Sequence, residues 1–137
     1  HTALASQVIL VPLNDDDKAH VISEVTELVS NYQAMRGKQL PADSEIAEEF
    51  RELPFLHVDN EGRIWNGVID HLYRHQNGQW VLADYKTDRK MKPEDHETQM
   101  RLYGEAARVW TKTTPRLQLV YLRHQQVEEI TGEPVPS

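Results

Sequence analysis

Two aspartates and a lysine lie in segments that otherwise read as strands. Asp70 falls in "GVIDHL" and Asp84 in "VLADYKT", with Lys86 two residues after Asp84. Aspartate is depleted from strands because its side chain competes for backbone hydrogen bonds. Side chains alternate along a strand, so Asp84 and Lys86 share one face. Carboxylates and an ammonium on one face can hold a cation and act on a group bound beside it.

The loop between the two segments decides whether the aspartates meet. A two-residue turn over 77–78 would put them on opposite faces of the hairpin. A three-residue loop over 76–78, with Gly78 in the left-handed third position, would put Asp70 directly opposite Asp84. We favour the three-residue loop because it also pairs two leucines across the strands.

A third carboxylate belongs to the preceding segment. If Val58 pairs with Ile64, Glu52 lies opposite Asp70, and three carboxylates form a row about 5 Å apart. Like charges so placed need a shared proton or a bound cation. Oxygen ligands suit Mg²⁺ or Mn²⁺. Lys86 would lie roughly 7 Å along the same face from Asp84.

The surrounding pattern predicts an α/β fold with a mixed central sheet flanked by helices. Helices are expected over 15–35, 42–50 and 94–110, the last with a buried stripe of Met100, Tyr103, Ala107 and Trp110. Strands are expected over 50–58, 64–75, 79–87, 116–124 and 127–131.

Composition narrows the class of protein. The net charge of -7 argues mildly against a free-standing nucleic-acid binder, unless carboxylates hold cations that meet the phosphates. The chain has no cysteine, which excludes an iron–sulfur cluster within it and fits a cytoplasmic location. No apolar run is long enough to span a bilayer. The histidines after residue 1 show no zinc spacing and are expected mostly at the surface.

Five short motifs resemble the PD-(D/E)xK nucleases, and more narrowly the C-terminal nuclease domain of RecB/AddA helicase–nucleases. They occur in the family's order and cover most of the chain: "ELPF" (52–55), "GVID" (67–70), "DYKTD" (84–88), "QMRLY" (99–103) and "VYLRHQQVEEI" (120–130). Each motif is weak alone, and "DYKTD" is the most specific. The resemblance implies a restriction-endonuclease-like core.

The resemblance also implies residue roles. Asp70, Asp84 and the carbonyl of Tyr85 would hold Mg²⁺ or Mn²⁺, Lys86 would orient the attacking water, and Glu52 would join the site.

Other roles concern the nucleic acid and the start of the chain. Gln99 and Tyr103, one helical turn apart, would position a DNA strand, although Tyr103 also fits a packing role. Arg89 and Lys90 would supply local positive charge. The family has a metal-binding histidine near its start, which makes His1 a candidate, but the turns that precede it in the family are absent here.

These observations favour a metal-dependent deoxyribonuclease domain spanning 1–137, expected to be the C-terminal part of a larger helicase–nuclease of double-strand break repair. Its expected partners are single-stranded DNA ends and a helicase portion. One alternative is a nuclease-like module that binds DNA or a partner without cutting. Another is a stand-alone structure-specific endonuclease of the same superfamily.

Overall fold

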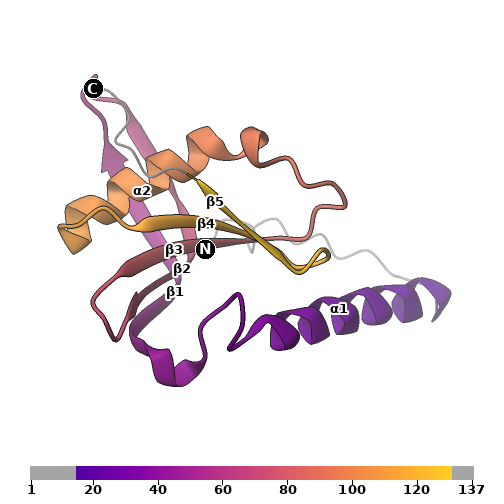
Figure 1. Ribbon diagram of the computed structural model, residues 1–137. Helices are drawn as coiled ribbons and strands as arrows, with labels where there is room; N and C mark the ends of the chain where they lie inside the picture. The colour runs from indigo at the N-terminus through magenta and orange to yellow at the C-terminus, as the bar shows by residue number, and fades with distance from the viewer. Residues whose placement is uncertain (1–14, 131–137) are drawn as a thin grey trace.

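A five-stranded mixed sheet in the order β1-β2-β3-β4-β5 forms the centre of the computed structural model, which describes residues 15–130 (Figure 1). All neighbouring strands are antiparallel except β3 and β4, which are parallel. The strands are β1 (Ile46–Val58), β2 (Ile64–His75), β3 (Trp80–Lys86), β4 (Arg116–Tyr121) and β5 (Gln126–Ile130). The α/β fold with a mixed sheet is therefore confirmed.

Helix α2 (Glu97–Thr111) provides the connection from β3 to its parallel neighbour β4 and covers one face of the sheet (Figure 1). A single 3₁₀ turn, η3 (Pro93–Asp95), precedes it. The α2-side cluster is the apolar core on this face, and its buried members include Ile69, Leu72, Leu82, Met100 and Leu119. Trp110 is 53% exposed, so the expectation that it is buried was wrong. Its ring instead contacts Phe50 and Trp80 edge-on near the last turn of the helix.

Helix α1 (Asp15–Met35) packs on the other face through its last turns only and otherwise extends beyond the sheet (Figure 1). Met35 is fully buried in the α1-side cluster, with Tyr73, Val81, Ala83 and Val120. Its acidic first turn, Asp15–Asp17, suits the helix macrodipole. No helix within 15–130 is both long and apolar enough to cross a membrane.

The helix expected over 42–50 is not formed. Only Asp43–Glu45 make one 3₁₀ turn, η2, and Ile46 already begins β1. Ile46 lies opposite His75 of β2, and Phe50 lies opposite Leu72. Cross-strand pairing with β2, including the apolar pair of Phe50 and Leu72, outweighs the helix propensity of the glutamate-rich segment.

Candidate active site

The β2–β3 hairpin has the three-residue loop favoured from the sequence. The amide of His75 donates to the carbonyl of Gln79 at 2.8 Å, and Gly78 adopts a φ of 94°. Glycine is required there because residues with a Cβ are strained at such a φ. The ladder continues through Leu72 opposite Leu82 and ends at the pair of His71 and Ala83. Asp70 and Asp84 therefore follow directly after the last backbone pair.

Side-chain alternation in β2 is interrupted at the same point. Ile69 and Leu72 are three residues apart, yet both are buried in the α2-side cluster. Strict alternation would put them on opposite faces. The first part of β2 therefore leaves the plane it would share with β3, and Asp70 lies where the two strands separate.

The side chains of Asp70, Asp84 and Lys86 lie together at the place where β2 and β3 diverge. Asp84 is buried, with 7% of its surface exposed, and its Oδ2 lies 2.7 Å from Lys86 Nζ. Oδ2 of Asp70 accepts the backbone amide of Tyr85 at 3.0 Å. Burial, and then the hydrogen bond and negative charge of Asp84, raise the pKa of Asp70 to about 7. The backbone amide of Tyr85 and the ammonium of Lys86 oppose that rise.

Two facing carboxylates of this kind fit a hard divalent cation. The pKa of Asp70 is raised partly because the negative charge of Asp84 lies beside it. A proton or a metal ion bound between the two carboxylates would neutralise this charge. The donors are all oxygens, and the carbonyl of Tyr85 lies between the two ends of the Asp84-x-Lys86 segment. Within the described residues, no three histidine or acidic side chains gather closely enough to hold a metal. The pair of Asp70 and Asp84 is thus the basis of the candidate metal site, and His1 lies outside the described residues.

Glu52 lies opposite Asp70 as expected, but its side chain does not lie with those of Asp70 and Asp84. Val58 lies opposite Ile64, and the pairs on either side of Glu52 place it across from Asp70. However, its backbone is left-handed, with a φ of 52°, and its side chain is exposed. A left-handed residue interrupts the alternation of a strand. The expected row of three carboxylates is not formed, because Glu52 does not join the close group.

Helix α2 places Tyr103, with Gln99 bonded to it, on the side of the sheet that carries Asp70 and Asp84. Gln99 Nε2 donates to the hydroxyl of Tyr103 at 2.9 Å. Burial and the charges of Asp84 and Asp70 raise the pKa of Tyr103, so the phenol is near both carboxylates. Its hydroxyl also lies against Gly67, where a Cβ would be only 3.1 Å away. Gly67 therefore permits the close approach of α2 to β2.

Arg89 and Lys90 lie in the segment after β3 and have exposed side chains. Arg89 pairs with Glu24 of α1 at 3.1 Å, and its carbonyl contacts His124 at 2.9 Å. These contacts join the segment to α1 and to the β4–β5 turn, not to the aspartates. Neither basic residue contacts Asp70 or Asp84.

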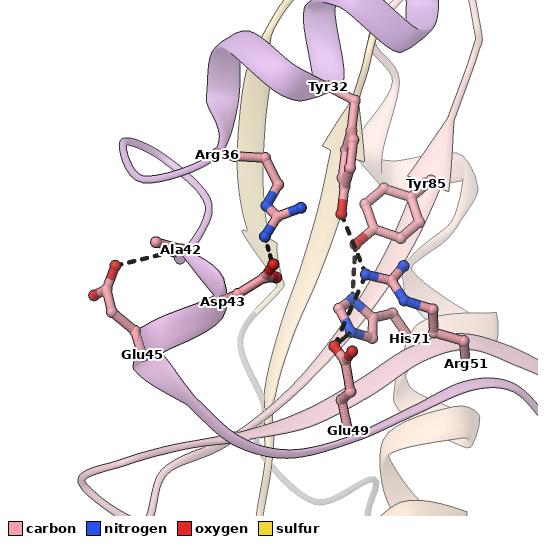
Figure 2. A network of polar contacts seen from close by, with 9 residues as sticks. All are labelled: Tyr32, Arg36, Ala42, Asp43, Glu45, Glu49, Arg51, His71 and Tyr85. Atoms are coloured by element: carbon pink, nitrogen blue, oxygen red, sulfur yellow. Dashed lines mark hydrogen bonds and ion pairs between the residues drawn. The ribbon is translucent and has the colours of Figure 1, made fainter.

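Most histidines were expected at the surface, and His71 is the exception among the described ones, because it is only 3% exposed. Its Nδ1 lies 2.7 Å from Tyr85 Oη and its Nε2 lies 2.9 Å from Glu49 Oε2. The side chains of His71 and Tyr85 lie on the α1 side of the sheet (Figure 2). The sequence held one signal of this burial, since His71 lies between the apolar positions of a central strand.

The chain belongs to the PD-(D/E)XK nuclease superfamily, whose family model matches residues 3–135. It is also similar to an AddA-type ATP-dependent helicase/nuclease protein of Lysinibacillus sphaericus (strain C3-41), with 51% identity over 43 residues. That match covers 28% of this chain and 4% of the relative. The narrower resemblance to AddA-type nuclease domains is confirmed by this relative.

Proposed function

We propose that this chain is a divalent-metal-dependent deoxyribonuclease domain that hydrolyses phosphodiester bonds. The observation that carries the proposal is the group of Asp70, Asp84 and Lys86 at the separation of β2 and β3, with Lys86 Nζ 2.7 Å from Asp84. Polar groups with shifted pKa values in a strand interior are typical of catalytic sites. Membership of a nuclease superfamily supports the same reaction.

The two aspartates and the carbonyl of Tyr85 would hold Mg²⁺ or Mn²⁺. When bound, such a cation lowers the pKa of water and offsets the charge that builds on the phosphate. Asp84 also fixes the ammonium of Lys86, which is thereby directed to hold the attacking water or a phosphate oxygen. A role for Glu52 requires its exposed side chain to turn toward the pair, and His1 remains a further proposed ligand.

The DNA strand would lie along the N-terminal half of α2. Gln99 donates a hydrogen bond to Tyr103, whose phenol lies near the two carboxylates. Their amide and phenol groups can donate to phosphate oxygens or stack with bases. Arg89 and Lys90 would add attraction at longer range, which suits exposed cations outside the site.

We further propose that the domain works within a larger cytoplasmic helicase–nuclease that processes double-strand breaks. The similarity to a helicase/nuclease protein supports this setting, and the chain spans 4% of the length of that relative. In that setting a helicase portion would deliver single-stranded DNA ends to the carboxylates.

Calorimetry with Mn²⁺ tests the metal site directly. Wild-type protein should bind Mn²⁺, and Asp84→Asn should lose most of this binding while retaining its fold by circular dichroism. Asp16→Asn, in the exposed first turn of α1, is the matched control and should bind as wild type does. Equal binding by wild type and Asp84→Asn would refute the metal site.

Cleavage of labelled single-stranded DNA in Mn²⁺ tests the activity. The wild-type chain should cut, whereas Asp84→Asn and Lys86→Gln should not. If the wild-type chain binds Mn²⁺ and DNA but leaves the DNA intact, the non-cutting module is the correct alternative.

A further inference from the structure

Figure 2 shows a hydrogen-bonded chain of side chains that crosses three strands on the α1 side of the sheet. Asp70 and Asp84 lie on the other side, near Tyr103 of α2. The chain of hydrogen bonds runs from Tyr85 of β3 through His71 of β2 to Glu49 of β1. Arg51 lies 3.8 Å from Glu49, and its Nη2 donates to the hydroxyl of Tyr32 on α1 at 3.3 Å. The edge of the Tyr32 ring packs against Tyr85, with centroids 5.7 Å apart. We call these five residues the back-face network.

The chemistry of the groups fixes the direction of each bond. The carboxylate of Glu49 only accepts, so His71 Nε2 carries the proton and donates to it. A neutral imidazole carries one ring proton, so Nδ1 is left as an acceptor. The hydroxyl of Tyr85 lies 2.7 Å from Nδ1 and donates to it.

Both central members of the network are sequence neighbours of the proposed ligands. His71 follows Asp70 directly, and Tyr85 lies between Asp84 and Lys86. The backbone ladder between β2 and β3 ends at His71, so no backbone pair holds the strands together beyond it. Hydrogen bonds that involve side chains hold them instead. On the site face Asp70 accepts from the Tyr85 amide and is hydrogen-bonded to Asp84, and on the back face the Tyr85 hydroxyl is bonded to His71.

We infer that His71 and Tyr85 are positioning residues, whose side-chain hydrogen bond holds the two aspartates at a separation that a divalent cation can bridge. The inference rests on the proposed function, since it assigns the network a purpose at the same site. Without the bond, the carboxylate of Asp70 would be the remaining group that joins the two strands by hydrogen bonds at this point. A carboxylate that also binds a cation holds the strands less firmly, because the cation and the Tyr85 amide compete for the same oxygens.

Tyr85→Phe removes only the hydroxyl and keeps the ring that packs on Tyr32 and His71. In metal-free protein, amide hydrogen exchange at residue 85 should accelerate about fivefold, the factor expected from one lost hydrogen bond. Mn²⁺ affinity should fall by about the same factor, and kcat for single-stranded DNA should fall while KM stays within a factor of two.

Two substitutions at His71 separate its two hydrogen bonds. His71→Asn places a carbonyl oxygen near the position of Nδ1, so it can still accept from Tyr85. His71→Gln places an amide nitrogen near the position of Nε2, so it can still donate to Glu49 but not accept from Tyr85. The Asn variant should approach wild type in exchange rate and Mn²⁺ affinity, and the Gln variant should match Tyr85→Phe.

Tyr73→Phe is the matched control, because Tyr73 is a buried tyrosine of β2 whose ring also contacts His71 at 4.6 Å. It should leave exchange at residue 85 and Mn²⁺ affinity unchanged. Unchanged exchange in Tyr85→Phe would overturn the inference, and so would equal effects of Tyr73→Phe and Tyr85→Phe. The exchange measurement needs no metal, so it is decided separately from the proposed nuclease activity, which fails if the wild-type chain neither binds Mn²⁺ nor cuts DNA.

Discussion

Replacing Asp70 with asparagine should stabilise the metal-free protein, and the gain should grow with pH. The pKa of Asp70 is raised from 3.8 to about 7 in the folded state because burial and Asp84 disfavour its charged form. The folded protein therefore binds the proton more tightly than the unfolded chain does. The contribution of Asp70 to the free energy of unfolding is largest at low pH and is lost progressively as pH rises from about 4 through 7.

The size of the effect follows from the same shift. Moving a pKa from 3.8 to about 7 corresponds to about 4 kcal/mol at pH 8, which is an upper limit. Asp70 is partly exposed, so solvent screens its charge, and we therefore expect about half of this value. Asparagine resembles the protonated acid: its carbonyl can accept the amide of Tyr85, and its NH₂ can donate to Asp84.

Urea unfolding in the presence of EDTA, followed from pH 5 to pH 8, measures this gain. The difference in unfolding free energy between Asp70→Asn and wild type should be positive and largest above pH 7. Asp59→Asn is the opposite control. Hydrogen bonds from Trp65 and Arg63 hold the pKa of Asp59 below its usual range, so this substitution should destabilise the protein at pH 8. A gain at Asp70 that is independent of pH, or a loss at pH 8, would refute the reasoning.

Three further outcomes follow from the site and its supports. Mn²⁺ affinity should fall about tenfold for each pH unit below about 7 and level off above it, because the proton on Asp70 competes with the cation. Calorimetry across about pH 5.5–8.5 measures this affinity, and an affinity that does not change with pH would contradict the prediction. Lys86→Gln should lower the cleavage rate by at least about 100-fold while Mn²⁺ binding stays within about threefold, since in the proposed mechanism the ammonium acts on the reacting groups and not on the cation. Single-turnover kinetics measure this rate, and a normal rate would remove Lys86 from the mechanism. Gly67→Ala should cost about 1–3 kcal/mol of stability, because a Cβ there would lie 2.9 Å from the Phe55 ring and 3.1 Å from the Tyr103 hydroxyl; a thermal midpoint equal to wild type would contradict it.

The sequence predicted the parts of the site that depend on local geometry. The loop over 76–78 needs a left-handed third residue, Gly78 provides it, and the loop length then fixes which residues of β2 and β3 are opposite each other. The pairing of Val58 with Ile64 followed in the same way from the turn between β1 and β2. Helix α1 has the bounds expected for the helix over 15–35.

The sequence did not predict features that depend on distant partners. The glutamate-rich stretch 42–50 has the propensity of a helix, but β2 offers a strand partner to its second half, from Ile46 onward. The left-handed backbone of Glu52 has no local signal, since glutamate rarely adopts it. The burial of His71 depends on Glu49 and Tyr85, which lie 22 and 14 residues away in the sequence.

The left-handed Glu52 also bears on self-association. Strand β1 is at one edge of the sheet, and its outer backbone groups could template another strand from a second molecule. Glu52 bends this edge and carries a charge, and Pro54, two residues later, has no amide to donate. The interruption that keeps Glu52 out of the carboxylate group thus also guards the longest strand of the sheet against edge-to-edge aggregation.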